Sequence, residues 1–165
     1  MYTFTYIFHT HALICYKIVM GKVVEIGIAK TKGGDMLNVK CIEAIKNKGL
    51  LNDRKFKENN DKKKQITLIE IENINYFNKV SKVLIPATNF RRNIITEGIK
   101  LNDLINKVFF IGKVKVKAHD LCKPCNYLQN LLKQNNFVEE LLLKGGLRCE
   151  IITTGKICTN DKITY

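Results

Sequence analysis

Two cysteines three residues apart, Cys122 and Cys125, are the residues whose type and spacing suggest chemistry most directly. They lie in the segment AHDLCKPCNYLQNLL, between a run with β-type alternation and a run with helical spacing. Four interpretations are open: a redox pair, half of a metal site, one reactive thiol beside an inert one, or two thiols that only pack. The choice among them depends on what surrounds the pair.

The first two interpretations lack supporting residues. A thioredoxin-type dithiol also needs a cis proline well downstream, but the prolines here are Pro86 and Pro124, and the elements before the motif are mostly β. A structural zinc site needs two more ligands. Cys149 and Cys158 are available, but each lies in a strand-like apolar run without a second Cys-x-x-Cys. One reactive thiol and an unreactive pair stay open.

Composition predicts one domain with its own core. The chain has 165 residues, of which 45% are hydrophobic, so it needs no disulfide bonds to fold. Its formal net charge of +13 favours anionic partners. Abundant Lys, Asn and Ile also fit an AT-rich genome, which weakens the charge as a sign of nucleic-acid binding. The remaining cysteines are expected to be buried free thiols, which indicates a reducing, cytoplasmic location: Cys15, Cys41, Cys149 and Cys158.

The first nineteen residues differ from the rest of the chain. Residues 1–19 carry no charge before Lys17, and we expect them to form an N-terminal extension outside a domain of residues 20–165. Their apolar stretches are shorter than the roughly 20 residues of a membrane span. Basic residues at the start and a small-residue cleavage site are both missing, so a signal peptide is not indicated either. A membrane-associated tail is the minor alternative.

Alternating apolar and polar residues predict many short strands. The opening strand is expected from Lys22, and the charged run at 46–64 is expected to be a solvated loop. The segment QITLIEIENINYFNKV predicts a strand that becomes a helix near Glu70, VFFIGKVKVKAH predicts a hairpin, and the last nineteen residues predict two strands. One apolar helical face is predicted after the cysteines from Leu128, Leu131, Leu132, Val138, Leu141 and Leu142. The expected fold is mainly β, a small barrel with peripheral α-helices.

The order of several motifs resembles the MOSC domain family, named after the C-terminal part of molybdenum-cofactor sulfurases. The matching segments, from Gly21 to Ile163, are GKVVEIGIA, KGLLNDRKF, QITLIEIE, FRRNIITEGIKLNDL, FFIGKVKVKAHDLCKPCNYL and GGLRCEIITTGKICTNDKI. Two asparagines, Asn52 and Asn160, stand where the family often has glycine. Asn tolerates left-handed backbone geometry, so we expect that geometry at both positions.

The resemblance implies a MOSC-type β-barrel that binds the molybdenum cofactor, Mo-molybdopterin. Cys125, after Pro124, matches the family cysteine that ligates molybdenum or is proposed to carry sulfur; Cys122 would then be inert and point inward. A thiolate suits both tasks, because it is a soft metal ligand and a nucleophile. The residues expected to cradle the pterin phosphate beside Cys125 are Arg54, Arg91, Asn93, Thr96 and, more weakly, Arg148. Pyridoxal phosphate is not expected in this module.

Two function classes remain open. The first is a cofactor-binding module, either a reductase of N-hydroxylated compounds or a sulfur-transfer component. The sequence has no ferredoxin-type cysteine set and no flavin or nicotinamide motif, so a reductase would need an electron-donor protein, and a sulfur carrier would need a sulfur donor. The alternative is a basic β-barrel that binds nucleic acid. The lack of an aromatic-rich strand face makes that partner less favoured.

Overall fold

The computed structural model describes residues 19–165 of the chain. Expectations for residues 1–18, including Cys15, lie outside these described residues. The strands are β1 (Val19–Ile28), β2 (Leu37–Asn38), β3 (Cys41–Ile45), β4 (Gly49–Leu50), β5 (Ile66–Glu70), β6 (Ile94–Glu97), β7 (Val108–Ile111), β8 (Val114–Leu121), β9 (Leu147–Ile151), β10 (Gly155–Cys158) and β11 (Lys162–Thr164). The helices are α1 (Ile71–Val80), α2 (Asn126–Leu132) and α3 (Phe137–Glu140), with 3-10 turns η1 (Ala87–Phe90) and η2 (Leu101–Leu104).

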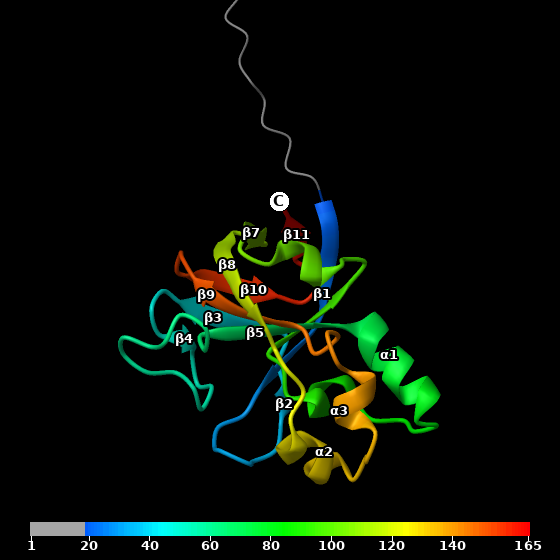
Figure 1. Ribbon diagram of the computed structural model, residues 1–165. Helices are drawn as coiled ribbons and strands as arrows, with labels where there is room; N and C mark the ends of the chain where they lie inside the picture. Colours follow the sequence, from blue (N-terminus) through cyan, green and yellow to red (C-terminus); the bar gives the residue numbers. More distant parts are fainter. Residues whose placement is uncertain (1–18) are drawn as a thin grey trace, which may run out of the picture.

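Seven strands of the described chain close into a barrel (Figure 1). Their order is β11-β7-β8-β9-β5-β6-β1, and the ring closes because β11 also pairs with β1. The β5–β6 pair is parallel, and its crossover contains α1 and η1. A separate sheet with the order β10-β3-β4 lies beside the barrel. The mainly β barrel with peripheral helices that the sequence predicts is therefore confirmed.

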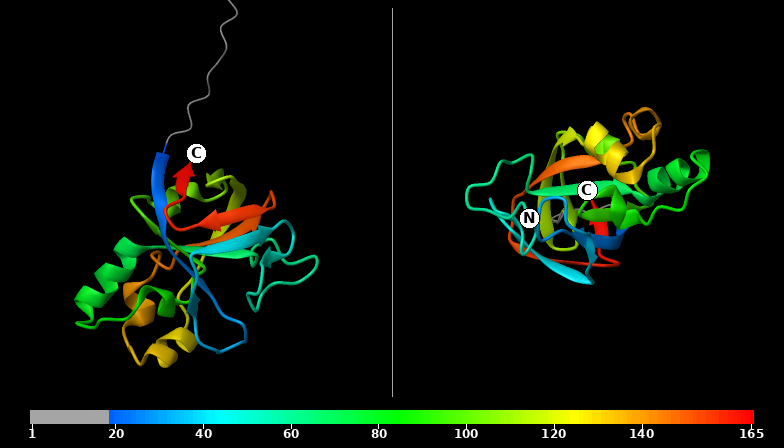
Figure 2. Two further views of the ribbon diagram at one scale, coloured as in Figure 1. Left: turned by 180° about the vertical axis from the view of Figure 1, so that it is seen from behind. Right: turned by 90° about the horizontal axis from the view of Figure 1, so that it is seen from below.

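Alternating side chains explain the barrel interior. In β8 the residues Val114, Val116 and Ala118 are buried, while the lysines between them are only partly buried. A second apolar cluster lies under the helices, where the rings of Phe77, Phe90 and Phe137 contact one another. The three helices gather at the end of the barrel away from the C-terminus (Figures 1 and 2). No helix within residues 19–165 is long and apolar enough to cross a membrane.

Several sequence expectations about element bounds were wrong. Strand β1 begins at Val19, three residues before Lys22, and Val19 pairs with Thr164. The C-terminal segment forms three strands, β9, β10 and β11, instead of two. The apolar face after the cysteines is interrupted, because Leu131 and Leu142 are exposed while Leu128 is buried.

Two of the predicted free thiols form a disulfide bond. Cys41 on β3 and Cys158 on β10 are directly opposite in the antiparallel register, and their sulfur atoms are bonded. The expectation that both are buried free thiols is therefore wrong. It failed because alternation within a strand does not reveal which distant strand will be its neighbour. Cys149, by contrast, is free and buried, as expected.

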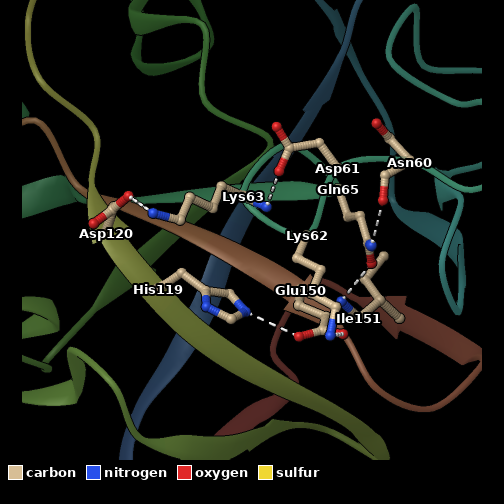
Figure 3. Close-up of polar contacts among 9 residues, drawn as sticks. All are labelled: Asn60, Asp61, Lys62, Lys63, Gln65, His119, Asp120, Glu150 and Ile151. Carbon is tan, nitrogen blue, oxygen red and sulfur yellow. Dashed lines mark hydrogen bonds and ion pairs between the residues drawn. The ribbon is translucent and has the colours of Figure 1, made fainter.

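The charged segment 46–64 is tied to the barrel as well as solvated (Figure 3). The Lys63 ammonium lies 2.7 Å from the Asp120 carboxylate, and the Ile151 backbone N–H donates to the Gln65 side chain at 2.8 Å. His119 Nε2 and Lys62 Nζ both contact the Glu150 carboxylate, at 2.9 and 3.5 Å. Lys63 thus joins the segment to β8 and Lys62 joins it to β9, while Gln65 holds the residue directly after it to β9. The His119 ring thus shares the Glu150 carboxylate with Lys62.

Candidate functional site

Cys125 lies at the N-cap of α2 with an exposed thiol. Its extended backbone lets the carbonyl oxygen accept hydrogen bonds from the N–H groups of Leu128 and Gln129, both at 3.1 Å. Pro124 precedes it and fixes its own φ without needing a hydrogen-bond acceptor. The prediction that the helix begins near Asn126 is confirmed. The Cys125 thiol is therefore exposed at the end of the barrel where the helices lie.

Cys122 occupies the opposite environment. Only 3% of it is exposed, its Sγ donates to the Leu147 carbonyl at 3.3 Å, and its N–H donates to the Gly146 carbonyl at 2.7 Å. The inward orientation expected from the sequence is therefore confirmed. Because one thiol is buried and bonded while the other is exposed, the two cysteines have different access to reagents.

The Gly145-Gly146 pair holds the cysteine segment in place. A Cβ atom added to Gly145 would lie much closer to the Cys122 carbonyl oxygen than 3.0 Å, the limit below which real Cβ atoms essentially never approach another heavy atom. It would also lie 3.5 Å from Pro124 Cδ. The Gly145 carbonyl also accepts a hydrogen bond from Arg92 Nε at 2.9 Å. The sequence predicted these glycines only as the end of a helix. In the structure these glycines allow their backbone to approach the backbone of neighbouring segments closely, because they have no Cβ atom.

Arg91 is a predicted site residue whose guanidinium has buried donors without partners. Its Nη1 donates to the Gly34 carbonyl at 2.9 Å, while its Nε and Nη2 atoms are buried without any hydrogen-bond partner. Arg91 lines a hollow of about 190 Å³ together with Gly33, Asp35, Met36, Asn89, Leu131 and Leu132. Buried N–H groups normally have acceptors. An anionic oxygen at this hollow would satisfy the two free donors.

The loop between β1 and β2 connects this hollow to the cysteine helix. A Cβ atom at Gly33 would lie 3.6 Å from the Tyr127 hydroxyl, two residues after Cys125. Figure 1 shows the loop and α2 at the same end of the barrel. The hollow that Arg91 lines therefore runs beside the helix that begins at Cys125.

Asn93 lies inside the fold, and its amide is fully used. Its Oδ1 accepts from Thr67 N and Thr67 Oγ1 at 3.2 and 2.8 Å. Its Nδ2 donates to the Gly27 carbonyl at 3.2 Å and to Asp53 Oδ2 at 3.4 Å. An amide offers two donors and two acceptor positions, so none is left for a ligand. Thr96 is also buried, and its hydroxyl donates to the Ile69 carbonyl at 3.3 Å.

Asp53 fixes the turn that carries Arg54. It is buried, and its carboxylate accepts from the N–H groups of Ala29 and Lys55 at 3.2 and 3.0 Å. The preceding Asn52 has φ 65°, and Asn160 has φ 70°, so the left-handed geometry expected at both asparagines is confirmed. The Asp-Arg turn is thereby held against the end of β1, with the Arg54 N–H donating to the Ala29 carbonyl.

Arg54 and Arg148 belong to a basic region centred on Lys55. A hollow of about 490 Å³ is lined by Lys30, Thr31, Lys32, Arg54 and Lys55. Another, of about 480 Å³, is lined by Ile105, Asp120, Leu121, Lys123 and Arg148. Burial lowers the pKa of Lys55, and the charges of Arg54 and Arg148 lower it further, against the opposing effects of Cys122 and Asp53. Arg54 and Arg148 therefore both act electrostatically on Lys55, although they line different hollows.

The structure does not place Arg54 and Arg91 in one hollow, contrary to the single cradle expected from the sequence. The segment 30–36 contributes to both hollows, with Thr31 lining that of Arg54 and Gly33 lining that of Arg91. Arg148 lies near Lys55, a residue that sequence reasoning missed. The one sequence feature that could have indicated a role for Lys55 is its position directly after the Asp-Arg turn.

No cluster of three or more His, Cys, Asp or Glu side chains in residues 19–165 is arranged to hold a metal ion. The second pair of zinc ligands considered from the sequence is not available, because Cys158 is bonded to Cys41. Cys149 is fully buried, and burial raises the pKa of its thiol well above the ordinary value. Cys125 is the exposed free cysteine of the described chain.

The family model of the MOSC domain matches residues 31–164. The chain belongs to the MOSC domain family. Among solved structures it is similar to the YuaD protein of Bacillus subtilis, with 19% identity, a TM-score of 0.75, and coverage of 90% of this chain and 96% of that one. It is also similar to YiiM from Geobacillus stearothermophilus, with 15% identity, a TM-score of 0.68, and coverage of 87% and 74%.

YiiM from Escherichia coli shows the same likeness, with 15% identity, a TM-score of 0.62, and coverage of 90% of this chain and 69% of that one. At these identities the likeness establishes the fold alone. A search of curated proteins finds no match. The MOSC family is linked to molybdenum cofactor binding, and this link is a property of the family.

Proposed function

We propose that this MOSC domain binds the molybdenum–pterin cofactor, with Cys125 as the thiolate ligand or sulfur carrier and Arg91 as the phosphate-binding residue. The observation that carries the proposal is the Arg91 guanidinium, whose Nε and Nη2 are buried without acceptors, on a residue that lines a hollow beside α2. Leaving buried donors unpaired costs about 1–3 kcal/mol each. A phosphate oxygen at that position would remove the cost.

The residues present fit part of the cofactor. Cys125 offers one exposed thiol, and the absence of a three-residue metal cluster in the described chain means that the other metal ligands would come from the cofactor itself. Lys55, Arg54 and Arg148 provide cations for further anionic groups. Asn93 and Thr96 do not fit as ligands, because their polar atoms are already bonded within the fold. We assign these two residues to positioning.

The protein's own contribution would be binding and orientation. Pro124 and the Gly145–Cys122 contact fix where the Cys125 sulfur lies, and Asp53 fixes the turn that presents Arg54. When bound, the cofactor would supply a metal centre able to exchange electrons or a sulfur or oxygen atom with a substrate. We propose N-hydroxylated compounds as substrates, with electrons from another protein, or sulfur transfer from a sulfur donor as the second form of the same proposal.

The decisive experiment is to purify the protein from a host that makes the cofactor and measure bound molybdenum and pterin fluorescence. Cys125→Ser should lose molybdenum, and Cys122→Ser, its matched control, should retain most of it. Arg91→Ala should weaken cofactor retention by about one to two orders of magnitude, since a charge-assisted hydrogen bond contributes roughly 1.5–3 kcal/mol. Lys46→Ala, which removes an exposed charge elsewhere, should not.

The second form of the proposal has its own readout. Sulfane sulfur on Cys125 would be released by cyanide and counted as thiocyanate, and Cys125→Ser should release none. A wild-type protein that holds neither molybdenum, pterin nor sulfane sulfur would refute the proposed function. Unchanged loading in Cys125→Ser would refute the role of this thiol.

A further inference from the structure

A separate cavity lies where β5 runs into α1. It has a volume of about 420 Å³ and is lined by Glu70, Glu72, Asn73, Gly98, Ile99 and Lys100. None of these residues lines the hollows of Arg54, Arg91 or Arg148. In a chain with a net charge of +13, this cavity places two carboxylates against one ammonium group. Its local charge is therefore opposite in sign to that of the whole chain.

Glu70 is the buried polar residue of this cavity. Only 7% of it is exposed. Its Oε1 accepts a hydrogen bond from the Leu101 N–H at 3.0 Å, but its Oε2 is buried without a hydrogen-bond partner. A carboxylate oxygen withdrawn from water without a donor is costly. The Glu70 oxygen therefore lacks one N–H or O–H donor.

The groups around Glu70 act on its carboxylate in both directions. Glu72 Oε1 accepts from the Gly98 N–H at 2.7 Å, so its charge adds to that of Glu70. Burial raises the pKa of Glu70, and Glu72 raises it further, although hydrogen bonds from the Glu70 and Leu101 backbone N–H groups and from the Asn73 side chain act in the opposite direction. The Glu70 Oε2 atom is the acceptor that these groups leave without a hydrogen bond.

We propose that this cavity binds the primary ammonium group of a small organic amine, whose N–H donates to Glu70 Oε2. An anion is disfavoured by the two carboxylates, and no three-residue metal cluster exists among residues 19–165. Ile99 gives the cavity an apolar wall for a short alkyl chain. The site is independent of Cys125 and of the cofactor.

The test titrates the full chain with n-butylammonium and follows the backbone amide resonances of Gly98 and Leu101, the two donors to the carboxylates. We expect saturable shifts with a dissociation constant of about 1–50 mM, the range for so small a ligand. Tetramethylammonium has the charge without an N–H, and 1-butanol has the shape without the charge. Both should bind at least about tenfold more weakly.

Glu70→Gln should weaken n-butylammonium binding by about tenfold or more, whereas Glu139→Gln, the same change on an exposed residue of α3, should leave it unchanged. The comparison of ligands on the wild-type protein decides the question even if Glu70→Gln does not fold. Absence of saturable shifts, equal binding of tetramethylammonium, or unchanged binding in Glu70→Gln would each overturn the proposal.

Discussion

Replacing Gly145 by alanine should displace the cysteine segment and destabilise the fold. The new Cβ would fall far inside 3.0 Å from the Cys122 carbonyl oxygen, which is backbone and cannot turn away as a flexible side chain can. Overpacking of this kind costs about 1–3 kcal/mol. The Cys122 N–H bond to Gly146 and the Sγ bond to Leu147 would also lengthen, at roughly 0.5–1.5 kcal/mol each.

The expected loss in the free energy of unfolding is therefore about 2–6 kcal/mol, a large share of the roughly 5–15 kcal/mol of a typical domain. Urea unfolding measures this loss. Native-state alkylation with iodoacetamide, read by peptide mass spectrometry, measures the displacement. In the wild type, Cys125 should react much faster than the buried Cys122 and Cys149. In Gly145→Ala, Cys122 should become reactive.

Gly98→Ala is the matched control. Gly98 has φ 75°, so alanine is strained there, but the nearest atom to an added Cβ is Gly21 Cα at 3.8 Å. This variant should lose about 1–2 kcal/mol from backbone strain alone and leave Cys122 protected. If Gly145→Ala keeps wild-type stability to within about 0.5 kcal/mol and Cys122 stays protected, the close backbone contact inferred here does not exist in solution.

Three further predictions follow from the hydrogen bonds, charges and register. Asn93→Ala should lower the free energy of unfolding by about 2–4 kcal/mol, measured in urea, because Thr67 and Asp53 lose buried partners. Burial raises the pKa of Glu70 above its ordinary 4.5 in the folded protein, so wild-type stability should fall as pH rises from 4.5 through this raised pKa; the stability of Glu70→Gln relative to wild type should therefore increase over that interval, and a constant difference would contradict this. A chain beginning at Met20 should melt close to the full chain, since it removes the Val19–Thr164 pair but keeps the rest of β1; a large loss of melting temperature would make the preceding residues part of the fold.

Local patterns predicted the elements well where short-range chemistry decides them. The change from strand to helix at Glu70 and the β7–β8 hairpin were confirmed, because alternation and helical spacing act over a few residues. The left-handed Asn52 and Asn160 were confirmed for the same reason. The exposure of Leu131 and Leu142 was not predicted, since Leu131 lies on a helix of only seven residues and Leu142 lies beyond the end of α3.

Long-range relations could not be read from one sequence. Cys41 and Cys158 are separated by 117 residues, and only the register of β3 with β10 makes them neighbours. The approach of Lys55 to Arg148 likewise depends on how the charged segment is tied to β8 and β9. These relations are set by strand order, which periodicity within a strand does not encode.

Arg91 and Asn93 show that two residues of one matched motif can have different roles. Both belong to the same FRRN segment and were expected to share one task. Arg91 ends η1 with φ 59°, and this turn leaves two guanidinium nitrogens without partners, whereas Asn93 enters the barrel and uses all four of its hydrogen-bonding positions. Loss of Asn93 should therefore act on stability, and loss of Arg91 on anion binding. Hydrogen-bond accounting separates a residue that positions the site from one that is free to bind a ligand.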